Sequence, residues 1–164
     1  SSYGRKDKKS IWSGWKFSDN IVEGVGESVK EISIKYYPGY KVTWRYKVDG
    51  NPLSYERFVN GEYHKSICSL DYGTTALPIT AQNILVQFVE METIDEVGRK
   101  EVKTIGSGDG YVLYGGRLIR GQWKKENLAS RTRFYDSQNE EIALMPGSTW
   151  VQIVPVGTVV EITN

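Results

Sequence analysis

Short segments in which apolar and polar residues alternate, each ended by turn residues, run through this chain from Val29 to Ile162. The clearest is Tyr40 to Val48, where every second residue is aromatic or valine and the residues between are Lys, Thr or Arg. A period of two is that of a β-strand with one buried face. No window of helical length carries a helical apolar period. The chain is therefore predicted to be all-β.

Turn residues set the register of several of these segments. Asn60-Gly61 is the strongest short hairpin signal in the chain, because both positions tolerate positive φ. The expected cross-strand pairs are Val59 with Glu62, Phe58 with Tyr63, Arg57 with His64 and Glu56 with Lys65. A second positive charge beside Arg57 is unfavourable, so His64 is expected to be neutral.

The later turns extend the same pattern. Gln82 to Met91 is apolar on both faces, which favours a central strand, and residues 70–80 are expected to form a loop. Gly115-Gly116 pairs Leu113 with Leu118 and Val112 with Ile119, a second hairpin turns near Val97-Gly98, and Thr149 to Val154 and Val156 to Ile162 close the fold. These elements predict an antiparallel meander of about ten strands, closed as a barrel or split as a sandwich.

Length and composition fit one domain of ordinary size. The chain has 164 residues and a net charge of +1, so no global basic excess favours a nucleic-acid partner. Residues 1–28 are expected to be a polar N-terminal segment and a leading segment, which either packs on the domain or is what remains of an interdomain contact. Residues 29–164 are expected to be a single all-β domain. A first residue that is not Met, in a polar and basic stretch, indicates a piece of a longer protein. No run has the length and apolarity of a membrane span or of a signal peptide core.

The candidate reactive groups have structural explanations. Cys68 is the only cysteine and is expected to pack as a small apolar residue. Gly106 to Gly110 lacks the Lys-Ser/Thr and the helix of a phosphate-binding loop, and Ser107 lacks the strand-to-helix turn of a nucleophile elbow. His64 has no visible catalytic partner. The carboxylates expected at turns are Asp49, Asp71, Asp95, Asp109 and Asp136. No catalytic residue, metal ligand or cofactor site is predicted.

One cluster of cations is the best candidate binding surface. Its predicted residues, with the neighbouring aromatic, are Tyr111, Arg117, Arg120, Lys124, Lys125, Arg131 and Arg133. Hairpin parity places Arg120 and Lys124 on one face with Tyr111, Leu118 and Gln122. Cations beside an exposed ring suit phosphate or sugar-acid polymers. A solvated sheet face, or a charged edge that resists pairing, explains the same residues.

The three tryptophans that lie in expected strands are predicted to be in the core. Trp44, Trp123 and Trp150 each lie in an alternating apolar set. Trp150 shares a face with Gln152, so it either fills the core or is a surface platform for a ligand; the core is the prediction.

An ordered set of motifs resembles a known family. The motifs are Tyr55-Glu-Arg57 with Asn60-Gly61, Gln82-Asn-Ile-Leu-Val86, Ile105-Gly-Ser-Gly108, Gly121-Gln-Trp-Lys124, Arg131-Thr132 to Tyr135-Asp136, and Leu144-Met-Pro-Gly-Ser-Thr-Trp150. Together they are similar to the C-terminal domain of YerB-like bacterial lipoproteins, over about Tyr36 to Val156. That family has no established reaction.

The resemblance implies a lipid-anchored protein outside the cytoplasmic membrane, with an N-terminal domain joined to this one. We therefore expect a noncatalytic binding domain whose partners are that N-terminal domain, an anionic envelope polymer or another envelope protein. Membrane contact is expected only through the lipid anchor. The alternative is an accessory or hydrolase domain that acts on envelope glycans or peptides, with its catalytic groups in the N-terminal domain.

Overall fold

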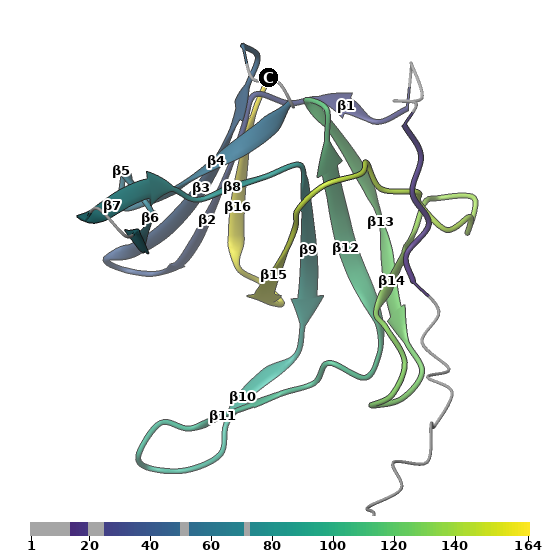
Figure 1. Ribbon diagram of the computed structural model, residues 1–164. Helices are drawn as coiled ribbons and strands as arrows, with labels where there is room; N and C mark the ends of the chain where they lie inside the picture. The colour runs from purple at the N-terminus through teal and green to yellow at the C-terminus, as the bar shows by residue number, and fades with distance from the viewer. Residues whose placement is uncertain (1–13, 20–24, 50–52, 71–72) are drawn as a thin grey trace, which may run out of the picture.

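The computed structural model describes residues 14–19, 25–49, 53–70 and 73–164, except for the side chains of residues 68–70 and 73–74. The polar segment 1–10, Asp71 and the side chain of Cys68 therefore lie outside the described residues. In the described ranges all regular structure is β, in sixteen strands, which confirms the predicted class. None of this part of the chain forms a helix long and apolar enough to cross a membrane. Two sheets lie face to face as a sandwich, the second of the two closures predicted (Figure 1).

The first sheet has six strands in the order β1-β13-β12-β9-β15, with β14 also paired to β13. Its strands are β1 Glu27–Ser28, β9 Asn83–Val89, β12 Gly106–Tyr114, β13 Arg117–Lys125, β14 Arg133–Tyr135 and β15 Thr149–Pro155. The position of β9 between β12 and β15 confirms the central strand predicted from its two apolar faces. β15 runs parallel to β9, which corrects the expectation of an antiparallel meander. The reason is the connection: residues 136–148 carry the chain across the sheet before β15 begins.

The second sheet also has six strands, in the order β16-β2-β3-β4-β5, with β8 paired to β4. Its strands are β2 Glu31–Tyr37, β3 Tyr40–Lys47, β4 Ser54–Val59, β5 Glu62–Tyr63, β8 Thr80–Ala81 and β16 Val159–Thr163. A short turn at Val156 and Gly157 separates β15 from β16. Because these two strands belong to different sheets, this turn joins the two layers at one end of the sandwich (Figure 1).

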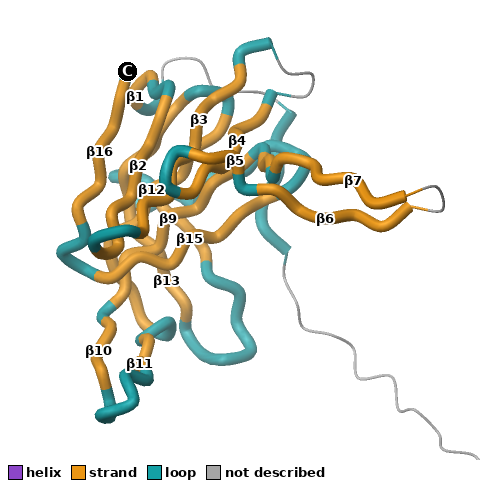
Figure 2. Tube along the Cα trace, turned by 90° about the vertical axis from the view of Figure 1, so that its left-hand side faces the viewer, coloured by secondary structure: helices purple, strands orange, loops and turns teal. Residues whose placement is uncertain are grey.

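Two hairpins project from the body of the sandwich (Figures 1 and 2). One pairs β6 Lys65–Leu70 with β7 Gly73–Pro78, and the other pairs β10 Met91–Thr93 with β11 Lys100–Val102. The second confirms the turn predicted near Val97-Gly98. The first corrects the loop predicted for residues 70–80: Gly73 and Pro78 stand at the two ends of β7, where they do not interrupt a strand.

The main core fills the space between the sheets. Its fully buried side chains include Ile32, Ile34, Val42, Trp44 and Tyr55 from the second sheet and Ile84, Val86, Leu113, Leu118 and Val154 from the first. The face predicted from alternation is buried at Val42 and Trp44 and half-buried at Tyr40 and Tyr46, but Val48 follows the end of β3 and is exposed, which corrects that position. Trp150 packs at the edge of this core, with its ring 5.4 Å from that of Trp44. Trp150 thus packs against the core, as predicted, although its side chain is only half-buried.

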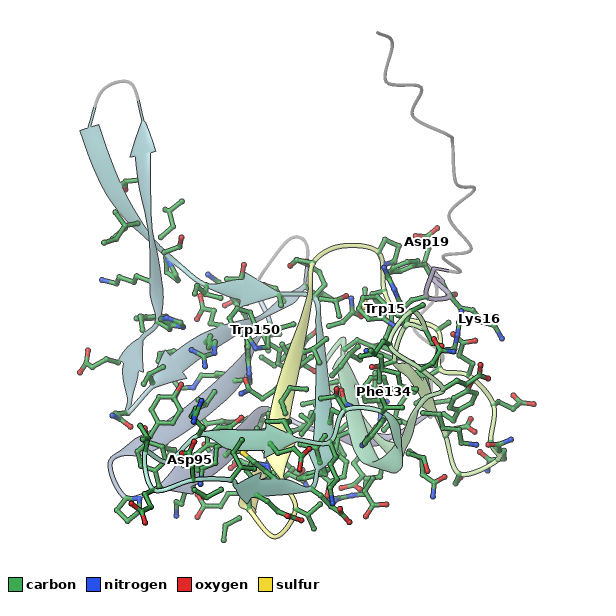
Figure 3. The ribbon with its side chains drawn as sticks, turned by 90° about the horizontal axis from the view of Figure 1, so that it is seen from below. Trp15, Lys16, Asp19, Asp95, Phe134 and Trp150 are labelled. Atoms are coloured by element: carbon green, nitrogen blue, oxygen red, sulfur yellow. The ribbon has the colours of Figure 1, made fainter. Side chains whose placement is uncertain are left out.

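A second cluster covers the opposite face of the first sheet. It contains Leu85, Val112, Ile119, Trp123, Phe134 and Leu144, with Trp15 and Ile142 packed against it. Trp15 donates its indole N–H to the carbonyl of Thr132 at 2.8 Å. Figure 3 shows Trp15 and Phe134 together on this side, away from Trp150. The first sheet is thus buried on both faces over part of its length, which explains the continuous apolar run of β9.

The registers set by local turns are confirmed. Phe58 pairs with Tyr63 and Val59 with Glu62, and Asn60 and Gly61 both have positive φ, 51° and 88°. The Gly115-Gly116 hairpin likewise pairs Leu113 with Leu118 and Val112 with Ile119.

One predicted pair is wrong: Glu56 does not face Lys65. Thr80 of β8 occupies that place beside Glu56. The hairpin ends at His64, whose N–H still donates to the carbonyl of Arg57 at 2.9 Å, and Lys65 already belongs to the projecting hairpin.

Candidate ligand-binding cleft

The inner face of the first sheet extends beyond the cover of the second sheet. Along β12 the inward side chains pass from buried Leu113, through half-buried Tyr111, to exposed Asp109 and Ser107. Along β9 they pass from buried Val86 through Phe88 to the exposed residue that follows the strand, Glu90. This end of the sheet is therefore open to solvent.

A cleft of about 580 Å³ lies at this open end. Its walls are the ends of β9 and β12, the base of the β10–β11 hairpin, and the turn between β15 and β16. The lining residues are Phe88, Glu90, Lys103, Ile105, Gly106, Ser107, Gly108, Asp109, Tyr111, Trp123, Val156 and Gly157. The cleft thus combines three aromatic side chains with a glycine-rich strand.

Gly108 is required by the packing of the cleft wall. A Cβ atom at this position would lie 2.8 Å from Nε1 of Trp123 and 3.1 Å from the carbonyl oxygen of Phe88. These two groups are joined by a hydrogen bond, in which the Trp123 indole donates to the Phe88 carbonyl at 2.7 Å. Any side chain on residue 108 would enter the space of that bond. The glycine therefore lets Trp123 fix the wall of the cleft.

Tyr111 is held in place from two sides. Its ring meets the edge of Phe88 at a centroid distance of 5.0 Å. The Arg120 guanidinium lies 4.9 Å from its centroid, and Nη1 donates to its hydroxyl oxygen at 3.0 Å. Arg120 also forms an ion pair with Glu27 at 2.6 Å, and this hydrogen bond lowers the pKa of the Glu27 carboxyl. The ring is consequently preorganised before any ligand arrives.

The charges of the cleft are partly balanced within it. Lys103 is 2.8 Å from a carboxylate oxygen of Glu90 and 3.3 Å from one of Glu92. The hydrogen bond from Lys103 lowers the pKa of Glu90. A general acid at neutral pH needs a carboxyl whose pKa is raised. Glu90 is therefore suited to accepting hydrogen bonds rather than to donating a proton.

The structure separates the predicted cationic residues into two groups. Arg120, Lys124 and Arg133 are on the inner face with Tyr111, as hairpin parity predicted for the first two. Arg117 and Lys125 have the opposite parity on β13, and Arg131 stacks on Trp15 at 4.4 Å, beside the second cluster. The predicted set is thus not one surface.

The inner-face cations contact groups of their own chain. Lys124 lies 4.8 Å from the ring centroid of Tyr135 and donates to the side-chain oxygen of Asn139. Arg133 bonds to the carboxylate of Glu141. Only Tyr111 of the predicted set lines the cleft. Arg120 and Lys124 flank it, because they pair across the hairpin with Tyr111 and Ser107.

Sequence reasoning missed most of the cleft. Gly106 to Gly110, for which the sequence predicts no site, begin β12, and four of these five residues line the cleft. Phe88, Lys103 and Gly157 come from three other places in the chain, and no local motif links them. Within the described ranges no three or more His, Cys, Asp or Glu side chains gather as a metal site would require.

The fold and the cleft define the class of the protein: an all-β sandwich domain with a solvent-open, aromatic-lined cleft at one end. Residues 32–151 match the family model described as "Protein of unknown function (DUF3048) C-terminal domain". Since this match covers most of the chain, the chain belongs to that family. The sequence resemblance to YerB-like lipoproteins is thereby confirmed.

The comparisons also include a relative by sequence and one by structure. The chain is 29% identical over 82 residues to the Bacillus subtilis (strain 168) protein named "Putative lipoprotein YerB", a match that covers 49% of this chain and 24% of that protein. It is similar to the crystal structure of YerB protein from Bacillus subtilis with a TM-score of 0.60 and 20% identity, over 84% of this chain and 46% of the other. The chain thus spans less than half of the relatives it matches, and the structural likeness supports the fold.

Proposed function

We propose that this chain is a noncatalytic binding domain of an extracytoplasmic lipoprotein, and that its cleft binds a segment of an envelope glycan. The observation that carries the proposal is the cleft itself. Its half-buried Phe88 and Tyr111 provide ring surface, while Ser107, Asp109 and Glu90 provide hydrogen-bonding groups. Sugar rings present the same combination of apolar C–H faces and hydroxyl edges, so they complement such walls.

The balance of charge favours a glycan over a highly anionic polymer. Lys103 is paired with Glu90, and Arg120 with Glu27. A polyanion would have to compete with these carboxylates for each cation. Sparse negative groups on a glycan could still reach Lys124, whose partners in the fold are an amide oxygen and a ring.

The extracytoplasmic location is supported by the likeness to the Bacillus subtilis protein named as a lipoprotein. Because the chain corresponds to a fraction of that protein, we place the lipid anchor and a partner domain in the remainder of a longer protein. The cleft would then hold the glycan while the other domain acts on that glycan or binds a partner protein. In the alternative function, an accessory or hydrolase domain acting on envelope glycans or peptides, the catalytic groups lie in the N-terminal domain, and this cleft holds the substrate for that domain.

The test uses a variant that fills the cleft without touching the core. Ser107 is exposed and lines the cleft, so Ser107→Trp should abolish binding of soluble glycan fragments released from bacterial cell walls, measured by calorimetry. The matched control is Thr163→Trp, an exposed position at the far end of β16. Equal glycan binding by both variants, or none by the parent, would refute the proposal. Release of reducing ends by a longer chain that includes the N-terminal domain would instead support the hydrolase alternative.

A further inference from the structure

A second site is indicated by a buried positive charge between the sheets. Arg57 of β4 lies opposite Trp44 of β3 and points into the sandwich, where it is only 3% exposed. Its guanidinium lies 4.9 Å from the ring centroid of Trp150 and 5.8 Å from that of Trp44. Figure 3 shows Trp150 on this inner side of the first sheet. Arginine is almost never fully buried unless it is paired with an anion.

No carboxylate of the described residues forms an ion pair with this guanidinium. All ion pairs in that part of the chain involve other cations, at Lys16, Lys35, Arg45, Lys47, Arg99, Lys103, Arg120 and Arg133. The hydrogen bond of the Arg57 guanidinium is made by Nη1 with Nδ1 of His64. Its Nε atom is buried without a hydrogen-bond partner. One edge of a planar donor group is therefore unused.

The polar neighbours of Arg57 do not neutralise it. Gln152 accepts from the indole of Trp44 at 3.4 Å and donates to the hydroxyl of Tyr36, which in turn donates to the carbonyl of Ile153 at 2.7 Å. These groups therefore form hydrogen bonds with one another and not with Arg57. Burial raises the pKa of Tyr36, so its phenol stays neutral and supplies no counter-charge. The neighbouring rings and amide groups lower the desolvation free energy of the buried guanidinium, but none of them carries a negative charge to compensate it.

We propose that Arg57 and His64 form a binding site for one carboxylate group of a ligand. The free Nε edge of the guanidinium matches the two oxygens of a carboxylate, and the single positive charge matches a single negative one. His64, Trp150 and Tyr36 lie near the guanidinium and are half-buried rather than fully buried, so we place the entry of the carboxylate on their side. This site shares no residue with the lining of the cleft, so it does not depend on the glycan proposal.

His64 would link this site to protonation. In the unliganded chain, burial and the Arg57 charge lower the pKa of His64, so the neutral ring accepts the bond from Arg57. A carboxylate placed beside both groups would neutralise Arg57 and favour the imidazolium. Arg57 is the one charged group of the described residues that acts appreciably on this ring. Carboxylate binding should therefore raise the pKa of His64.

The single histidine makes the test direct, because the chain has one His and its imidazole gives one NMR titration curve. We expect sodium acetate to displace the titration midpoint of His64 upward relative to sodium chloride of equal ionic strength. N-acetylglycine and glucuronate, in place of acetate, would distinguish a peptide end from a sugar acid. Equal curves in all carboxylates and chloride would overturn the proposal, and a displacement by dimethyl phosphate alone would overturn the choice of carboxylate.

A variant separates this role from a structural one. Arg57→Met keeps an apolar stem against the two tryptophans and removes the charge, a change that buried ionic positions often tolerate. It should raise the pKa of His64 without any anion and weaken acetate binding by roughly tenfold or more. Unchanged acetate binding in Arg57→Met would refute the site. If this variant does not fold, Arg57→Lys tests the two-oxygen geometry instead: it retains the charge but has no Nε edge, so acetate binding should weaken, and unchanged binding would refute the site.

Discussion

The Gly108→Ala variant is the sharpest test of how the cleft wall is built. The new methyl carbon would lie 2.8 Å from Nε1 of Trp123 and 3.1 Å from the Phe88 carbonyl, both closer than normal contact. Because those two atoms are already bonded at 2.7 Å, the methyl can be accommodated only if Trp123 moves. Trp123 is 2% exposed and belongs to the cluster behind the sheet, so its movement disturbs the packing there.

The size of the effect follows from three contributions. Leaving the buried indole N–H and its carbonyl partner unsatisfied costs about 1–3 kcal/mol. Overpacking against the displaced ring costs about 1–3 kcal/mol more. Alanine in a strand recovers about 0.5–1 kcal/mol relative to glycine. The net loss is therefore about 1–5 kcal/mol, with a midpoint of about 3 kcal/mol that for a chain of this size lowers Tm by about 6–12 °C.

Thermal and urea unfolding followed by circular dichroism would measure this loss. Gly14→Ala is the matched control, because a Cβ at Gly14 meets no atom within 4 Å. That control should remain within about 0.5 kcal/mol of the parent, as surface substitutions do. If Gly108→Ala melts within about 2 °C of the parent, a shift worth less than 1 kcal/mol, the steric reasoning fails.

Three further predictions concern the main core and its edge. Tyr55→Phe should cost about 1–2 kcal/mol in urea unfolding, because the Gly116 N–H that donates to the Tyr55 hydroxyl at 3.1 Å loses its buried acceptor; an unchanged midpoint would contradict this. Trp150→Ala should cost about 2–4 kcal/mol, less than for a fully buried tryptophan, because its ring packs on Trp44 but its side chain is only half-buried; a loss under 1 kcal/mol would refute the packing. For His64 the folded pKa lies below the ordinary 6.5, so stability is greatest above that pH and falls as the pH drops through it; His64→Gln should lose this part of the pH dependence, and equal profiles would contradict it.

The sequence predicted the fold wherever a turn determines the pairing. Asn60-Gly61 and Gly115-Gly116 each bring adjacent strands together, so their registers depend on residues that are close in the chain. The parallel pairing of β15 with β9 depends instead on how residues 136–148 cross the sheet. Nothing in the local pattern of either strand encodes that path. The same reasoning explains the wrong pairing of Glu56 with Lys65. The residue that pairs with Glu56 is Thr80 of β8, which comes fifteen positions after Lys65 in the chain, so the local turn does not determine this pair.

The candidate sites were predictable only in part, for the same reason. Parity placed Tyr111 and Arg120 on one face, and the structure makes them a stacked pair. The cleft also needs Phe88, Lys103 and Gly157, which meet only when the two sheets and the hairpin are in place. For Arg57 a signal was present: it stands between Tyr55 and Val59 on the face that β4 turns toward Trp44. A cation at an inward position of a strand is a candidate site from sequence alone.

The position of the cleft is consistent with the different lengths of β12 and β13 in the first sheet and of β16 in the second. β12 and β13 have nine residues each, so they span about 30 Å at the usual rise of a strand. In the second sheet, β16 has only five residues. The turn that precedes it, at Val156 and Gly157, forms one wall of the cleft. The inward side chains of β12 therefore pass from buried to exposed along this one strand, from Leu113 in the core to Ser107 in solvent. At that boundary an aromatic ring is half-covered, and a ligand can complete its burial.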